Sequence, residues 1–183
     1  MGKFLISALV LSLSLTGCSQ SSETEVAGPE PTPSIAESLI PSAPPEDVVD
    51  VDPASFLTSY GDVIFKVGDG PTWCTMSEFD DFVICEHREF DAKYAPLPVP
   101  EDCQNTYGYQ LRLRGNPVEG SKMAEFTCAN ANWSDPSSAL ALASGERITT
   151  FGFTCFVEGQ SARCENSARD FIVLGPEAWA TSD

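Results

Sequence analysis

The chain is poor in positive charge. It contains 10 Lys and Arg residues against 27 Asp and Glu residues, which gives a formal net charge of −17. Nucleic-acid binding needs a basic surface that releases counterions from phosphates, and this chain has no such surplus. The composition therefore argues against nucleic acid as a partner. It favours cationic partners or a spacing role, although an acidic surface also serves solubility alone.

The chain has a single histidine, and it lacks the glycine patterns of phosphate-binding loops and dinucleotide sites. A Ser-His-Asp or Cys-His site needs an imidazole held by an acid. His87 could act as a base with Glu86 or Glu89, but it follows Cys85 in a charged run that is more typical of a strand end. We therefore assign no catalytic residue, no metal and no cofactor.

Acidic residues leave one enzymatic alternative open, because two carboxylates can hydrolyse a glycosidic bond. The candidates for such a pair are Glu78, Asp80, Asp81, Glu86, Glu89 and Asp91. A calcium site at Asp80-Asp81 or at 50–52 lacks the spaced oxygen ligands and the glycine of a known calcium loop. We expect these acids to be mostly solvated.

Long apolar runs are also scarce, since none approaches the 18 residues of a membrane-spanning helix. The longest, Phe4 to Leu15, follows Lys3 and leads into Leu15-Thr16-Gly17-Cys18, which has the form of a bacterial lipobox. This order predicts a signal peptide at 1–17. In bacterial lipoproteins the cysteine after the box is lipidated, so we expect Cys18 to anchor an extracytoplasmic protein to the membrane without spanning it.

Residues 18–52 have the composition of a linker. They contain the lipidated cysteine, many Pro, Ser and acidic residues, and no Lys or Arg. Such a segment buries too little apolar surface to fold, and Pro together with like charges extends it. We predict a disordered tether that lifts the domain off the membrane. A short docking element at 39–40 and 48–51 is the alternative for these parts of the segment.

Residues 53–183 are predicted to form one all-β domain. Runs of β-branched and aromatic residues alternate with Gly, Pro and Asn turns, which is typical of short strands. The expected architecture is a small antiparallel sandwich or an open barrel of hairpins, stapled by three disulfides. The clearest strand candidates are 63–67, 82–85, 107–114, 122–128, 147–157 and 170–174.

Six cysteines remain in the domain once Cys18 is assigned to lipid. No two are close enough for a C-x-x-C zinc motif, and an even set in an exported chain is typical of disulfides. A tight turn at Gly159-Gln160 places Cys155 opposite Cys164, at a separation that suits a disulfide. The same hairpin logic pairs Cys74 with Cys85, and Cys103 with Cys128.

The cysteine order and several aromatic motifs resemble a family of secreted and lipid-anchored actinobacterial domains of unknown function. This resemblance implies a β fold and export, but no activity. Tyr107-Gly108 stands where relatives commonly have Trp-Gly, and 167–170 replace a Gly-rich approach to the last strand. The motifs that carry the resemblance are Trp73-Cys74, Val83-Ile84-Cys85, 94–100, Cys103, Tyr107-Gly108, Phe126-Thr127-Cys128, Phe153-Thr154-Cys155, Gly159, Cys164-Glu165-Asn166 and 171–174.

Aromatic residues supply the candidate ligand surface. Flat amphipathic rings bind sugars or peptides at low entropy cost, and Trp133 lies in a polar loop where we expect it to be exposed. We group Trp133 with Tyr107 and Tyr109. The leading hypothesis is a non-enzymatic binding module that contacts an envelope protein or glycan. A carboxylate hydrolase and a structural accessory subunit of a membrane complex are the alternatives.

Overall fold

The computed structural model describes residue 41 and residues 47–182. The predicted signal peptide, Cys18 and most of the predicted linker lie outside these residues. Within the described part, no helix has both the length and the apolar character needed to cross a membrane. The helical elements there are three short 3-10 turns, η2 (Pro53–Phe56), η3 (Glu89–Asp91) and η4 (Pro136–Ser138).

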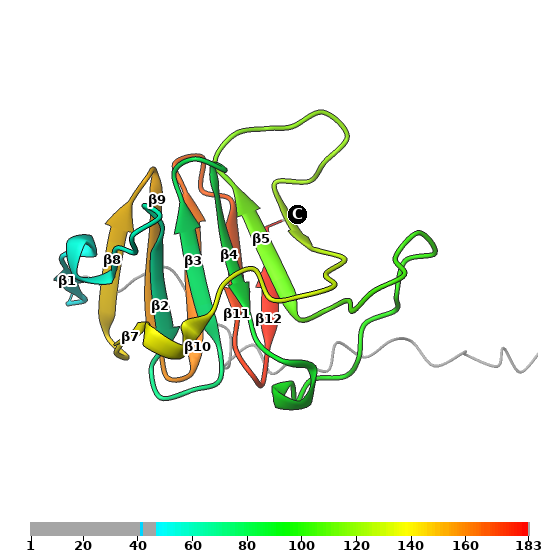
Figure 1. Ribbon diagram of the computed structural model, residues 1–183, viewed down its shortest axis with the longest axis horizontal. Helices are drawn as coiled ribbons and strands as arrows, with labels where there is room; N and C mark the ends of the chain where they lie inside the picture. Colours follow the sequence, from blue (N-terminus) through cyan, green and yellow to red (C-terminus); the bar gives the residue numbers. More distant parts are fainter. Residues whose placement is uncertain (1–40, 42–46, 183) are drawn as a thin grey trace, which may run out of the picture. The chain divides into compact units, whose positions relative to one another are not determined.

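The strands form two sheets that face each other across the core. In β2 (Val63–Val67), Val63, Phe65 and Val67 are buried in the core while Ile64 and Lys66 point to the opposite face. Figure 1 shows the green strands of one sheet in front of the orange and red strands of the other. The predicted all-β sandwich is therefore confirmed, with two sheets that do not close into a barrel.

Each sheet has six strands. Sheet A has the order β1 (Val49–Val51), β8 (Glu146–Thr150), β9 (Phe153–Glu158), β10 (Ser161–Asn166), β11 (Phe171–Leu174) and β12 (Trp179–Thr181). Sheet B has the order β6 (Ala124–Phe126), β5 (Gln110–Arg114), β4 (Phe82–Glu86), β3 (Trp73–Ser77), β2 (Val63–Val67) and β7 (Leu140–Leu142).

Most strand pairs are antiparallel, as predicted, but each sheet also contains one parallel pair at its edge. The edge strand β1 pairs in parallel with β8, and the edge strand β7 pairs in parallel with β2. Both pairs join segments far apart in the chain, which hairpin reasoning cannot find because a hairpin joins only antiparallel neighbours. Sheet A also includes Val49–Val51, which lie inside the predicted linker. This is the position of the alternative prediction, a short docking element at 48–51.

The predicted long strand at 147–157 is wrong, because it is a hairpin of β8 and β9. Thr150 faces Phe153 across a two-residue turn, Phe151-Gly152, in which both residues have positive φ, 53° and 81°. Two successive residues with positive φ match the twist of a hairpin in a type I′ turn. Phenylalanine is unusual in such a turn, so the sequence resembles one continuous strand.

The three predicted disulfides are present. Cys74–Cys85 and Cys155–Cys164 join directly opposed residues of neighbouring strands, with Cα separations of 4.1 and 4.0 Å. Cys103–Cys128 links the segment before β5 to the chain two residues after the end of β6. The Gly159-Gln160 turn also has the predicted register, since Glu158 faces Ser161 and Gly159 has a φ of 61°.

Two of these disulfides meet in the middle of the core. Sγ of Cys85 in sheet B lies 3.9 Å from Sγ of Cys164 in sheet A, and all four cysteines of the two bridges are fully buried. Cys74, Cys85 and Cys164 consequently bring three sulfur atoms within 4.8 Å of one another. This spacing resembles that of a metal site, but each sulfur is already bonded to another sulfur and offers no thiolate.

Replacing both Cys155 and Cys164 with Ala is expected to lower the free energy of unfolding by about 3 kcal/mol. The short loop alone accounts for roughly that amount in the chain-entropy description of disulfides. Urea unfolding of the variant and of the unaltered protein measures the difference. A loss below about 1 kcal/mol would show that the core does not depend on this bridge.

Candidate ligand-binding groove

A buried carboxylate organises the outer face of sheet B. Glu86 ends β4 and is only 2% exposed, yet among the described residues no Lys or Arg forms an ion pair with it. Four N–H groups satisfy its two oxygens instead. They come from Trp73 Nε1 at 2.7 Å, Gln110 Nε2 at 2.5 Å, Trp133 N at 2.9 Å and Ser134 N at 3.1 Å. A carboxylate with this many donors can stay buried, because hydrogen bonds to a charged group are strong.

Glu86 thereby fixes the β6–β7 segment, residues 127–139, against the sheet. Figure 1 shows the yellow part of this segment crossing in front of sheet B on its way to β7. A 2.7 Å hydrogen bond between the hydroxyls of Thr75 and Ser134 adds a further attachment. The Trp133 ring meets the Phe82 ring edge to face, with centroids 5.0 Å apart. The position of Trp133 is therefore set by both its backbone and its ring.

Trp133 borders a groove of about 520 Å³, which we call the Trp133 groove. Trp133 is 48% exposed, as its polar loop had predicted, and Tyr60, which also lines the groove, is 93% exposed. Leu57 and Leu140 add exposed apolar surface. The remaining lining consists of Ser55, Phe56, Thr58, Ser59, Asp62, Ile64, Ser134, Asp135, Ser138 and Ala139.

The walls of the Trp133 groove come from two short capped turns. Asp52 caps η2 by accepting a hydrogen bond from Ala54 N, and Asp135 caps η4 by accepting from Ser137 N and Oγ. The hydrogen bonds from Ser137 hold the pKa of Asp135 below its ordinary value. Asp135 is thus ionised at neutral pH, and the groove combines apolar rings with hydroxyls and negative charge.

The three predicted ligand-surface residues line different hollows. Trp133 borders the Trp133 groove, whereas Tyr109 borders a hollow of about 220 Å³ beside His87 and Glu89. Tyr107 borders a third hollow of about 760 Å³, where its ring contacts that of Phe126. Gly108, with a φ of 95°, separates the two tyrosines and lies before β5, so they do not continue the alternation of that strand.

His87 is buried and both of its ring nitrogens have partners. Nδ1 lies 3.3 Å from Thr72 Oγ1, and Nε2 lies 2.9 Å from the hydroxyl of Tyr94, which donates to the carbonyl of Gly108 at 2.7 Å. Burial lowers the pKa of His87 to about 4, and burial followed by the proximity of Tyr109 raises the pKa of Tyr94. The imidazole is therefore neutral, and it joins three segments of the chain.

Glu86 does not orient His87, because consecutive strand residues point to opposite faces. The candidate acids of the hydrolase alternative are likewise divided. Asp80 and Asp81 lie in the turn that precedes β4, where Ser77 and Asn116 hydrogen-bond to their carboxylates. Glu86 lies at the far end of the same strand, roughly 16 Å further along.

The acids considered for calcium at the start of the domain also have partners. Asp50 forms a two-point ion pair with Arg147, with distances of 2.6 and 2.8 Å. The hydrogen bond from Arg147 holds the pKa of Asp50 below its ordinary value. Asp52 accepts the capping hydrogen bond of η2. These carboxylates therefore support β1 and the turn that follows it.

A scan against protein-family models, a search of curated proteins and a search of solved structures each found no match. The resemblance to actinobacterial domains stays a prediction. Sequence reasoning missed Tyr60, although it lies in the polar turn Thr58-Ser59-Tyr60-Gly61 and carries the same signal as Trp133. Leu57 and Leu140 carry no comparable signal, because only the parallel pairing of β2 with β7 brings their segments together.

Replacing Glu86 with Gln is expected to lower the free energy of unfolding by about 2–3 kcal/mol, because the amide presents a donor to N–H groups that need an acceptor. Hydrogen exchange of the amides at 130–135 should accelerate as the β6–β7 segment loosens. Urea unfolding and exchange mass spectrometry measure both effects. Glu89→Gln, at an exposed acid nearby, is the control and should change stability by less than about 0.5 kcal/mol.

The buried imidazole predicts loss of stability in acid. Protonation of His87 is harder in the folded protein, with a pKa of about 4, than in the unfolded chain, with a pKa of 6.5. Its contribution is therefore complete above pH 6.5 and falls as the pH drops toward 4, by up to about 3 kcal/mol. Urea unfolding from pH 7 to 4 should show a smaller decline in His87→Gln than in the unaltered protein.

The same residue provides a direct spectroscopic check. It is the single histidine of the chain, so its ring protons are assigned without ambiguity in an NMR titration. The ring signals should not shift between pH 7 and about 5 while the protein stays folded. A midpoint near 6.5 would contradict the buried, neutral imidazole.

Proposed function

We propose that this chain is a lipid-anchored extracytoplasmic protein whose β-sandwich is a non-enzymatic binding module of a bacterial cell envelope. The lipobox ending at Cys18 and the acidic, Pro-rich segment after it support anchoring and display. Three disulfides support an oxidising compartment, since such bridges are rare in the cytosol.

The Trp133 groove is the observation that supports binding. Its aromatic wall is held in place before any ligand arrives, because Glu86 binds the backbone N–H of Trp133 and Phe82 supports its ring. A preformed site loses little conformational entropy on binding. Exposed rings beside several hydroxyls and two carboxylates match a carbohydrate, whose apolar ring faces stack on aromatics while its hydroxyls form hydrogen bonds.

Charge narrows the class of carbohydrate. Asp62 and ionised Asp135 border the groove, and the whole chain carries a formal charge of −17. This field repels anionic polymers. The proposed ligand is therefore a neutral or amino-sugar segment of an envelope glycan.

Glycan binding in this proposal depends on the exposed aromatic residues of the Trp133 groove. It needs no catalytic group. The buried Glu86 and His87 already have structural partners: Glu86 accepts four hydrogen bonds, and both nitrogens of His87 are in contact with a hydroxyl. The proposal accordingly assigns Trp133 and Tyr60 to ligand contact, and Glu86 to positioning Trp133.

Replacing Tyr60 with Ala is expected to weaken glycan binding about tenfold, because the loss of a stacked ring costs about 1.4 kcal/mol. The probe is a panel of neutral and amino-sugar oligosaccharides released from bacterial cell walls, measured by calorimetry. Trp133→Ala should weaken binding by at least as much. Tyr60 is almost fully exposed, so its removal leaves the fold intact even if the Trp133 variant is unstable.

Phe79→Ala is the matched control, because Phe79 is 95% exposed and does not line the groove. It should leave the affinity unchanged. Equal loss in all three variants, or no binding of any oligosaccharide by the unaltered protein, would reject the glycan proposal. Cleavage of the probe would support the hydrolase alternative, and selective capture of an envelope protein through Tyr60 would replace the glycan with a protein partner.

A further inference from the structure

Two apolar residues on the outer face of sheet A are more deeply buried than residues of a solvent-facing sheet surface should be. Phe156 and Val173 lie beside Arg163 in the sheet, on strands whose neighbouring residues Cys155, Cys164 and Ile172 point into the core. Adjacent strand residues point to opposite faces, so Phe156 and Val173 point away from the core. They are nevertheless only 2% and 0% exposed.

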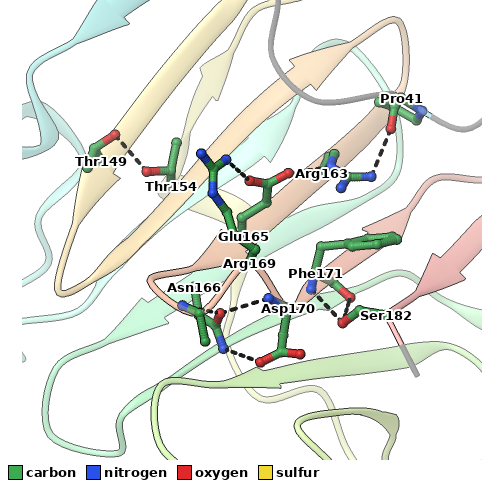
Figure 2. A network of polar contacts seen from close by, with 11 residues as sticks. Pro41, Thr149, Thr154, Arg163, Glu165, Asn166, Arg169, Asp170, Phe171 and Ser182 are labelled. Atoms are coloured by element: carbon green, nitrogen blue, oxygen red, sulfur yellow. Dashed lines mark hydrogen bonds and ion pairs between the residues drawn. The ribbon is translucent and has the colours of Figure 1, made fainter.

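One residue of the predicted linker lies at this face. Pro41 is buried, and its carbonyl accepts a hydrogen bond of 3.2 Å from an Arg163 guanidinium nitrogen. Pro41 also borders a hollow of about 310 Å³ formed by the β9–β10 turn and Pro176. Figure 2 shows Pro41 next to Arg163 in space, although the two residues are more than a hundred positions apart in the sequence.

Two further interactions fix the conformation of the Arg163 side chain. Its guanidinium stacks over the Phe171 ring at 3.7 Å and donates from Nε to Glu165 at 2.7 Å. Glu165 also accepts a hydrogen bond from Arg169 at 3.3 Å (Figure 2). Stacking and ion pairing together fix the side chain, so the nitrogen facing Pro41 is oriented before the linker arrives.

We propose that the linker residues just before Pro41 dock on the outer face of sheet A. Residues 35–40 include Ile35, Leu39 and Ile40, the largest aliphatic cluster between Cys18 and Pro41. Leu39 and Ile40 directly precede Pro41 and reach at most about 7 Å from it. The attachment through Pro41 also gives them a high effective concentration at the face. Aliphatic side chains at this place match the apolar surface of Phe156 and Val173.

Docking would change the reach of the tether. The free part then extends from Cys18 to Ser34, about 50 Å when fully extended at roughly 3.1 Å per residue. Without docking of 35–40, the free part would extend from Cys18 to Ile40, about 70 Å at the same rise per residue. The height above a membrane rests on the proposed lipid anchor, whereas the docking itself does not.

Methyl NMR of the full chain tests the docking directly. Nuclear Overhauser effects are expected between the Val173 methyl groups and the methyl groups of Leu39 or Ile40. Their absence would overturn the proposal. A sample that mixes two differently labelled forms of the chain separates contacts within one molecule from contacts between molecules. Nuclear Overhauser effects that arise only between different molecules would place a second copy on this face and would also overturn the proposal.

Limited digestion with a Glu-specific protease gives a second readout. Cleavage after Glu37, within the docked residues, should be about tenfold slower than cleavage after Glu25, within the free tether. Leu39→Ser combined with Ile40→Ser should remove this difference. Arg163→Met leaves the linker sequence unchanged and should also speed cleavage after Glu37. Equal rates at Glu37 and Glu25 in the unaltered chain would overturn the docking, and neither result depends on glycan binding.

Discussion

The contact between two disulfides in the core is the constraint on which the sandwich depends. Cys74–Cys85 crosslinks β3 to β4 and Cys155–Cys164 crosslinks β9 to β10, and their sulfur atoms approach to 3.9 Å between the sheets. Each bridge fixes the register of one hairpin, and the contact fixes which part of one sheet faces which part of the other. Polarisable sulfur fills this narrow space well, because it packs like a small apolar group.

A second constraint is the satisfaction of one buried charge. The Glu86 carboxylate needs donors on every side, and two of them are backbone N–H groups of the β6–β7 segment. The part of this segment that contains Trp133 and Ser134 is thereby fixed on the outer face of sheet B. The same hydrogen bonds position Trp133 at the proposed binding groove, so stability and ligand recognition share one residue.

The two outer faces of the sandwich have different proposed occupants. On sheet B, the β6–β7 segment covers part of the surface and leaves the Trp133 groove open. On sheet A, Phe156 and Val173 are buried on either side of Arg163, which donates a hydrogen bond to Pro41, and the linker itself is the proposed cover. Such an arrangement would attach the domain to its tether at one face and leave the opposite face for a ligand.

Local information in the sequence determined the hairpins and their disulfides. The Gly159-Gln160 turn predicted that Cys155 faces Cys164, because a tight turn sets the register of its strands within a few residues. The exposure of Trp133 was also predicted, from the polar residues around it. The β8–β9 hairpin was missed because Phe151 occupies a turn position that usually carries Asn, Asp or Gly.

Only the tertiary structure decided which distant segments meet. The parallel edge strands β1 and β7, the four donors around Glu86 and the joining of Tyr60 to Trp133 in one groove all link residues far apart in the chain. Sequence patterns record which face of an element is apolar, whereas the partner of that face is selected by packing of the whole core.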